Sequence, residues 1–219
     1  MIPRFKPEFS LAELLSIFIY PTEDIEILLE KSFSKLMKQK FTIFLPYGRT
    51  SLIFLLKALN IKNKEIICPA YTCVVVSHAI VKSGNIPIFV DSTEKDFNMN
   101  WDKVENLITH KTAAVISTSI FGYPVDLDKQ RQFSNKFKNI VIIQDCAHSF
   151  SAKWNGQEVQ QFCKAAFFGA NISKIITTVF GGFITTNDYK LYQKIIKIKS
   201  QNIKSYSLKN EFKKRFYLF

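Results

Sequence analysis

Short apolar runs alternate with amphipathic segments along most of the chain, and this alternation constrains the fold more than any other feature. The segments between the runs carry the three- and four-residue spacing of helices. Strands that alternate with helices are typical of a parallel sheet covered by helices on both faces. We therefore predict an α/β fold with three layers, αβα, around a mostly parallel sheet. The strand-like runs are EIICPA (65–70), IPIFVD (86–91), AAVISTSIFG (113–122) and NIVIIQDCA (139–147), and the helical segments between them are TCVVVSHAIVKSG (72–84), WDKVENLI (101–108) and DLDKQRQFSNKF (126–137).

Further segments extend this pattern toward both ends of the chain. A length of 219 residues suffices for one domain with a sizeable core. We predict an N-terminal helical segment at 1–38, a large α/β domain at 39–190 and a helical tail at 191–219. The additional helical segments are LAELLSIFI (11–19), DIEILLEKSFSKLMKQK (24–40) and YGRTSLIFLLKALNI (47–61), and the additional strand-like runs are FTIFLP (41–46), AAFFGA (165–170) and FGGFITT (180–186).

Charge and cysteine content argue against several classes of protein. The formal net charge is +12, but lysine and arginine are spread along the chain without a nucleic-acid reading motif. No apolar run approaches the roughly 20 residues that a membrane-spanning helix needs, and the N-terminus lacks an apolar signal segment. The four cysteines have neither metal-site nor disulfide-framework spacing. We therefore expect a cytoplasmic protein with reduced thiols, and no nucleic acid, metal or membrane span.

One lysine stands where a charged side chain is costly. Lys174 lies in GANISKIITTVFGGF (169–183), between an apolar aromatic run and a glycine pair. Its amine either reaches the surface along the flexible stem or is placed inside for chemistry. A partly desolvated lysine amine near a cation has a lowered pKa and is nucleophilic, which suits a Schiff base with an aldehyde.

Three more polar features fall at expected strand ends or helix starts. Asp145 follows the apolar run VIIQ, where it either caps a turn or offers a carboxylate to a cation such as a protonated pyridine ring. His148 follows closely, as a structural histidine or as a partner for a bound ring. YGRTS (47–51) starts a helix whose first N–H groups are either capped by a hydroxyl or free to bind a phosphate. Ligands of parallel sheets sit beyond such strand ends.

Taken in order, these features resemble the DegT/StrS family of sugar aminotransferases, which use pyridoxal 5′-phosphate on the fold-type I scaffold. Five segments in register make a specific signal, although no single one is decisive. The resemblance implies the large domain of fold-type I enzymes and covers roughly residues 40 to 190. The matching segments are YGRTSLIFLLKAL, EIICPAYTCVVVSHAIVKSGNIPIFVDS, SIFGYPVDLD, VIIQDCAHSFSAKWNG and SKIITTVFGGFITTND.

The resemblance also implies a role for each matching position. Lys174 matches the lysine that forms the Schiff base with the cofactor and then shuttles a proton. Asp145 matches the carboxylate that pairs with the pyridinium nitrogen, and His148 matches the residue near the ring hydroxyl. Arg49 and Thr50 fall on the phosphate-binding turn, and Thr50 is the expected direct donor.

Two positions depart from the family's pattern. Tyr71 and Cys73 fall on the segment that covers the ring face, and Cys73 stands where the family often has an aromatic residue. Gly169 stands where the family usually has a serine that binds the phosphate. Asn171 or Ser173 would have to compensate for that serine.

The function implied by the resemblance is transamination of a keto-sugar carried on a nucleotide, with glutamate as the expected amino donor, in surface polysaccharide synthesis. Family enzymes are homodimers, so a homodimer is implied. Family chains also extend into a smaller C-terminal domain, which we expect to be missing here, so the main alternative is an inert member that at most binds the cofactor. A dehydratase with the same cofactor is a further alternative. The resemblance implies that such dehydratases have histidine where this chain has Lys174, so Lys174 argues against this alternative. A basic nucleic-acid-binding module comes last.

Overall fold

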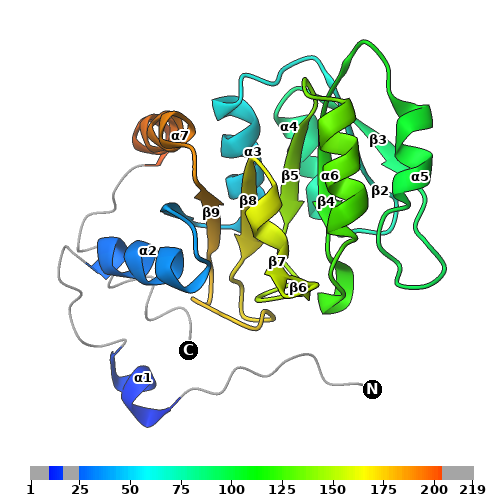
Figure 1. Cartoon of the computed structure of the whole chain (residues 1–219). Helices are drawn as coiled ribbons and strands as arrows, with labels where there is room; N and C mark the ends of the chain where they lie inside the picture. The colour runs from blue at the N-terminus through cyan, green and yellow to red at the C-terminus, as the bar shows by residue number, and fades with distance from the viewer. Residues whose placement is uncertain (1–9, 17–24, 204–219) are drawn as a thin grey trace.

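The computed structural model describes residues 10–16 and 25–203 of the chain (Figure 1). Within these residues seven strands form one sheet, in the order β1–β9–β8–β5–β4–β2–β3. β9 runs antiparallel to both of its neighbours, and all other neighbouring strands are parallel. The mostly parallel sheet expected from the sequence is thereby confirmed. The strands are β1 (Phe41–Leu45), β2 (Glu65–Pro69), β3 (Ile86–Val90), β4 (Thr112–Thr118), β5 (Val141–Asp145), β8 (Ala165–Gly169) and β9 (Gly182–Thr186).

Helices cover both faces of the sheet, which confirms the three-layer αβα architecture (Figure 1). One face packs against α3, α4 and α7, and the other against α2, α5 and α6. Within the described ranges, no helix is both long and apolar enough to cross a membrane. The α-helices are α1 (Leu11–Ser16), α2 (Ile25–Leu36), α3 (Gly48–Ala58), α4 (Val74–Lys82), α5 (Trp101–Val104), α6 (Leu127–Lys136) and α7 (Tyr189–Asn202), and the 3-10 helices are η1 (Glu105–Leu107), η2 (Ile120–Gly122) and η3 (Val159–Phe162).

The strands are apolar on both faces because each face lies under a helical layer. Ile66 of β2 packs toward α3 and α4, whereas its neighbour Ile67 packs toward α5 and α6. Ile184 and Phe183 of β9 divide between the two faces in the same way. Successive side chains of a strand point to opposite faces, so continuous apolar runs fit a sheet covered on both sides.

Several expected elements are shorter than their sequence pattern. The helix expected over 101–108 is split between α5 and η1. The strand expected over 113–122 ends at Thr118, and η2 follows it. The buried side chain of Asn98 accepts a hydrogen bond from the Ile120 N–H at 2.9 Å, so this N–H no longer pairs with a strand. At the termini, the expected helix 11–19 is described only as α1, and the tail beyond residue 203 lies outside the described residues.

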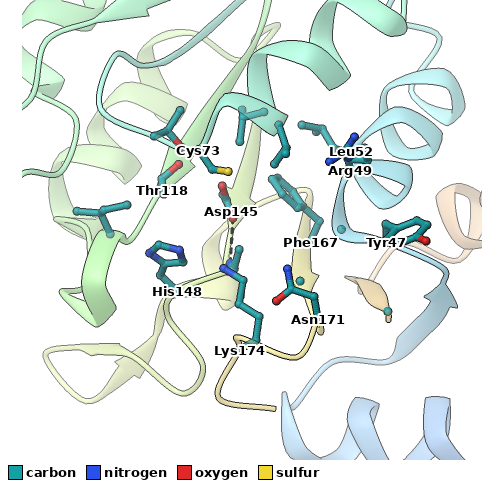
Figure 2. A pocket seen from close by; sticks show the side chains of 18 residues that line it. Tyr47, Arg49, Leu52, Cys73, Thr118, Asp145, His148, Phe167, Asn171 and Lys174 are labelled. Atoms are coloured by element: carbon teal, nitrogen blue, oxygen red, sulfur yellow. Dashed lines mark hydrogen bonds between the residues drawn. The ribbon is translucent and has the colours of Figure 1, made fainter. Parts of the chain in front are cut away.

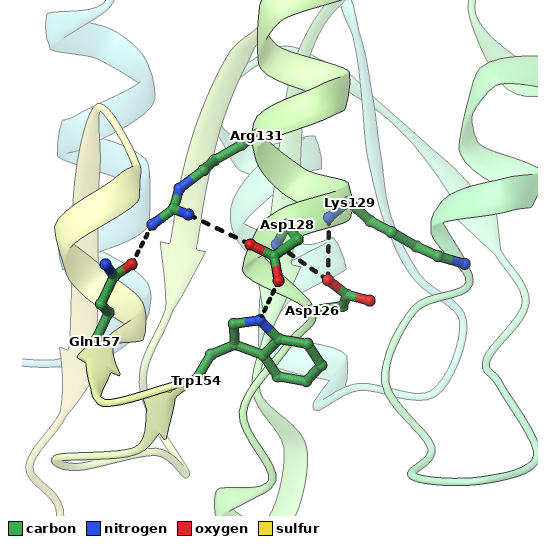
Figure 3. A network of polar contacts seen from close by, with 6 residues as sticks. All are labelled: Asp126, Asp128, Lys129, Arg131, Trp154 and Gln157. Atoms are coloured by element: carbon green, nitrogen blue, oxygen red, sulfur yellow. Dashed lines mark hydrogen bonds and ion pairs between the residues drawn. The ribbon is translucent and has the colours of Figure 1, made fainter.

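A short hairpin that the sequence analysis did not anticipate follows β5. It consists of β6 (Lys153–Trp154) and β7 (Gln157–Glu158) and is joined by polar contacts to α6 (Figure 3). The Trp154 indole donates to Asp128 at 2.8 Å, and Arg131 donates to both Asp128 and Gln157. These contacts fix the long connection between β5 and β8 against the helical layer.

The edge strand β1 is covered by a charged cluster. Glu30 of α2 accepts a hydrogen bond from the Phe44 N–H at 2.7 Å, which satisfies a backbone group that has no strand partner on that side. Lys199 of α7 forms ion pairs with Glu30 at 3.2 Å and with Glu26. The cluster therefore links α2, β1 and α7, and it also places α7, which the sequence analysis assigned to the tail, against the sheet.

Backbone approaches backbone where β8 and β9 meet the start of α3. A Cβ atom built on Gly182 would lie 2.5 Å from the Gly48 nitrogen and 2.5 Å from the Tyr47 carbonyl carbon. A Cβ atom on Gly48 would lie 3.2 Å from the Cα of Gly169. We call these three residues, Gly48, Gly169 and Gly182, the glycine contact. Side chains at its centre would push the first turn of α3 away from the sheet.

The glycine contact predicts a strong stability effect. Gly182→Ala should lower the free energy of unfolding by about 3 kcal/mol or more, because the methyl group would overlap backbone atoms that cannot move independently. Gly156→Ala is the comparison, since Gly156 has a φ of +79° but open space around its Cβ position. Gly156→Ala should lower the free energy of unfolding by only about 1 kcal/mol. Urea unfolding measures both, and equal costs would contradict the close packing described.

Candidate functional site

A cavity of about 150 Å³ opens at the carboxyl ends of the parallel strands, where α3 and α4 begin (Figure 2). It lies where ligands bind in open α/β sheets, beyond the strand ends. Six of the nine predicted site residues line it, and they come from four separate parts of the chain. They are Arg49, Cys73, Asp145, His148, Asn171 and Lys174.

Asp145 is the most buried of these charged groups. It is the last residue of β5, is only 3% exposed, and accepts a hydrogen bond from the Ala147 N–H at 2.9 Å. Burial raises the pKa of its carboxyl from 3.8 to about 6. The Ala147 N–H, the positive charge of Lys174 and the Thr118 hydroxyl lower that pKa but do not offset the burial. The carboxylate is therefore short of a partner and would gain from a cation beside it.

Lys174 points from the loop between β8 and β9 toward Asp145, so its amine lies inside the cavity (Figure 2). Burial lowers the pKa of the amine, while the charge of Asp145, and that of Cys73 whenever its thiol is ionised, raise it. The net shift is downward, which increases the neutral, nucleophilic fraction near neutral pH. The structure thus resolves the choice left open by the sequence in favour of the interior position.

His148 stands on the loop after β5, on the same side of the cavity as Lys174 (Figure 2). Burial lowers the pKa of its imidazole, and the positive charge of Lys174 lowers it further. The ring is therefore neutral at neutral pH, and it can donate one hydrogen bond and accept another. Its ring centroid lies 6.3 Å from that of Phe121.

The start of α3 offers hydrogen-bond donors to the cavity. The first N–H groups of a helix have no partner within the helix, and the Tyr47 side chain does not cap them. Gly48 and Arg49 line the cavity, so these N–H groups and the Arg49 guanidinium suit an anion. Thr50, expected to be the more direct donor, instead lines a neighbouring cavity with Lys199.

The loop that carries Lys174 shows which residue can replace the missing serine. A Cβ atom at position 169 would lie in ordinary van der Waals contact, 3.4 Å from the Cε atom of Lys174, but the glycine present there has no side chain to bind a phosphate. Asn171 lines the cavity, and its Oδ1 accepts hydrogen bonds from the N–H and the hydroxyl of Ser173. The Asn171 amide nitrogen is then the group that can face a ligand. Ser173 itself is not among the lining residues.

Tyr71 also lies outside the lining residues, whereas Thr118, which is not among the residues predicted from the sequence, is one of them. Tyr71 is exposed at the surface and contacts the rings of Phe97 and Phe121. Thr118 ends β4, pairs in register with Asp145 on β5 and lines the cavity. The signal for Thr118 was available in principle, because it is a polar residue that ends an apolar strand next to the strand of Asp145.

Asp145 predicts a pH dependence of the stability of the ligand-free protein. Its pKa of about 6 in the folded state exceeds the ordinary 3.8, so the folded protein binds this proton more tightly than the unfolded chain does. The free energy of unfolding should therefore fall by about 3 kcal/mol from this group as the pH rises from about 3 to about 7, with most of the fall between about 4 and 6. Asp145→Asn should lack this fall. Urea unfolding across that range measures it, and parallel profiles for the two proteins would contradict the assignment.

Known proteins resemble the chain in sequence and in structure. It is 32% identical to the GDP-perosamine synthase of Escherichia coli O157:H7 over 175 residues, which are 80% of this chain and 48% of that protein. It is 28% identical over 178 residues to the GDP-4-keto-6-deoxy-D-mannose 3-dehydratase of Yersinia pseudotuberculosis, covering 78% of this chain and 45% of that protein. The aminotransferase from Psychrobacter cryohalolentis superposes with a TM-score of 0.84 at 24% identity, covering 94% of this chain and 56% of that one.

The chain spans about half the length of the curated relatives it matches. Residues 22–216 match the DegT/DnrJ/EryC1/StrS aminotransferase family, which is nearly the whole sequence. The structural likeness confirms the fold, and the family match agrees with the resemblance found in the motifs. The chain therefore belongs to the DegT/DnrJ/EryC1/StrS aminotransferase family, whose aminotransferases use pyridoxal 5′-phosphate.

Proposed function

We propose that this protein is a pyridoxal-phosphate-dependent aminotransferase that moves an amino group from an amino acid, glutamate, to a nucleotide-linked keto-sugar. The observation that carries the proposal is the position of Lys174 and Asp145 in one cavity at the strand ends (Figure 2). An amine with a lowered pKa and a buried carboxylate short of a cation are the two groups that this chemistry needs.

The residues of the cavity fit the cofactor at each of its ends. Asp145 would pair with the ring nitrogen, because a pyridinium is the cation that its buried carboxylate lacks. Arg49, the first turn of α3 and the Asn171 amide would hold the phosphate. When bound, the cofactor supplies an electron sink for negative charge that develops on the substrate carbon.

The chain's own side chains would handle the proton transfers. Lys174 in its neutral form can accept a proton from a substrate carbon and return it to another atom within reach of its flexible stem. His148, neutral at neutral pH, would donate a hydrogen bond to the ring hydroxyl without adding a second positive charge beside Lys174. The low exposure of Asp145 keeps water away from the ionised end of the site.

The substrate class is inferred from relatives and the location from the thiols. A relative at 32% identity is a GDP-perosamine synthase, and another is a dTDP-sugar transaminase of Shigella dysenteriae at 27%. These names support a nucleotide-linked sugar as the substrate, and the place in surface polysaccharide synthesis rests on the family resemblance alone. All four cysteines are free, which supports a reducing compartment and hence the cytoplasm.

A homodimer is the proposed assembly. Tyr71, Phe97 and Phe121 form an exposed aromatic cluster whose ring centroids lie 5.9 to 6.3 Å apart. Each ring is more than half exposed, and Phe121 also contacts His148 of the cavity. A contiguous apolar patch of this kind is typical of an interaction surface. A second copy placed on it would also shield the mouth of the cavity.

Two other functions remain as alternatives within the family. An inert member that at most binds the cofactor is favoured by Gly169 and Cys73, which depart from the expected serine and aromatic residue. A dehydratase is favoured by the relative from Yersinia pseudotuberculosis at 28% identity. Lys174 supports transamination over dehydration, because the resemblance places histidine at that position in the dehydratases.

The proposal predicts that pyridoxal 5′-phosphate attaches covalently to one lysine. Wild-type protein should develop a visible absorbance band that borohydride fixes as a mass increase on the peptide containing Lys174. Lys174→Ala should show neither signal and should lose transamination of a nucleotide-linked keto-sugar with glutamate. Lys57→Ala, which removes an exposed lysine of α3, is the control and should behave as wild type. A folded wild-type protein without the absorbance band would contradict the proposed enzyme activity. A band without amino transfer would favour the alternative of an inert member that only binds the cofactor.

Titration of the protein with pyridoxal 5′-phosphate, followed by the same absorbance band, tests the phosphate end of the site. Arg49→Met should weaken cofactor binding by about tenfold to a hundredfold, because a charge-assisted hydrogen bond is lost. Thr50→Val should leave the affinity nearly unchanged, since Thr50 faces the neighbouring cavity. The reverse order of effects would restore Thr50 as the donor expected from the sequence.

The aromatic cluster predicts the oligomeric state. Phe121→Ser should weaken dimerisation at least about tenfold, because it removes an apolar ring from the centre of the patch. Phe89→Ser is the control, since Phe89 is a similarly exposed ring on the edge strand β3, outside the cluster. Light scattering after size exclusion at several concentrations measures both. A wild-type monomer, or equal effects of the two changes, would contradict this interface.

A further inference from the structure

The four cysteines differ sharply in access. Cys68 and Cys146 are buried, and burial raises the pKa of the Cys68 thiol to about 12 and that of Cys146 well above its usual range. Burial also raises the pKa of the Cys163 thiol to about 12, and this thiol donates to the Gln160 carbonyl. Cys73 alone among the four is exposed. Cys163 is partly exposed, so a thiol reagent meets one fully exposed thiol, that of Cys73, in the folded protein.

Cys73 faces the same cavity as Lys174 and Asp145 (Figure 2). It precedes α4 as its N-cap residue, and its side chain makes no capping hydrogen bond, so the thiol is free to point into the cavity. Negative charge at Cys73 raises the pKa of the Lys174 amine. Both side chains line the cavity, so a group added to the sulfur would enter the space that the amine faces.

Two hydroxyls mark the wall beside Cys73 as a place for a polar ligand. Thr118 is 4% exposed and lines the cavity, and its hydroxyl lies near enough to Asp145 to lower the pKa of that carboxyl but forms no hydrogen bond of ordinary geometry among the described residues. The Thr72 hydroxyl, next to Cys73 in the chain, is likewise buried without such a partner. Buried hydroxyls are normally paired, so both can bind a polar group that enters here.

We propose that Cys73 is a modification site. Small polar disulfides exchange with its thiol, and the group that stays attached to the sulfur blocks the cavity. The Cys73 sulfur, as thiolate, attacks one sulfur of the incoming disulfide. A new S–S bond forms, the original S–S bond breaks, and the second half leaves as a thiolate, so no other oxidant is needed. The half that remains attached occupies the cavity beside Lys174, and a thiol reductant reverses the step. Thr72 and Thr118 would hold its polar groups.

The test uses the full chain and the aromatic disulfide 5,5′-dithiobis(2-nitrobenzoate). Wild-type protein should release about one equivalent of thiolate in a fast phase, and peptide mapping should place the adduct on Cys73. Cys73→Ser should lose this phase, whereas Cys163→Ser should keep it. A fast phase that survives in Cys73→Ser, or equally slow reaction of every thiol in the folded wild type, would overturn the proposal.

The position in the cavity is tested with pyridoxal 5′-phosphate. In protein that shows the covalent cofactor band, the bound cofactor should slow the fast phase at least about tenfold, and prior modification of Cys73 should prevent the band until dithiothreitol is added. An unchanged rate would overturn the placement beside Lys174. The fast phase itself requires no cofactor. A protein that forms no band but still reacts at Cys73 would therefore refute the proposed function while supporting the modification site.

Discussion

The glycine contact between the start of α3 and the ends of β8 and β9 is the constraint on which the site depends. Gly48, Gly169 and Gly182 let the backbone of a helix and two strands approach to distances that a Cβ atom on Gly182 would prohibit. This approach brings the N–H groups of α3 to one side of the cavity and the Lys174 loop to the other. A serine at position 169 would begin close to the Lys174 side chain.

The cavity is organised around charges that are incompletely compensated. Burial disfavours the ionised form of both Asp145 and Lys174, and their mutual attraction offsets only part of that cost. A structural ion pair would be expected to satisfy its members more fully with hydrogen bonds. Groups left in this condition at the ends of parallel strands are typical of a site that is completed by a ligand. Cys73 adds a third reactive side chain to the same small space.

The sequence was sufficient to predict the αβα layers, because strands covered on both faces and helices covered on one have distinct patterns. It also predicted the residues that follow strand ends, such as Asp145, since strand direction places them at one edge. It could not distinguish Arg49 from Thr50, because a small rotation about the α3 axis decides which neighbour faces the cavity. The β6–β7 hairpin was overlooked although Asn155–Gly156 is a strong two-residue turn signal.

The strands that come first and last along the chain, β1 and β9, are neighbours in the sheet, and this has a consequence for synthesis on the ribosome. Phe41 of β1 pairs with Thr186 of β9, so the two partners are about 145 residues apart in the chain. At about 5–20 residues per second, β1 emerges roughly 7–30 seconds before the strand that it needs. Until then both β1 and the free edge of β8 expose unpaired backbone groups. Nascent chains of this protein should therefore depend on chaperones mainly in the interval just before residue 186 emerges.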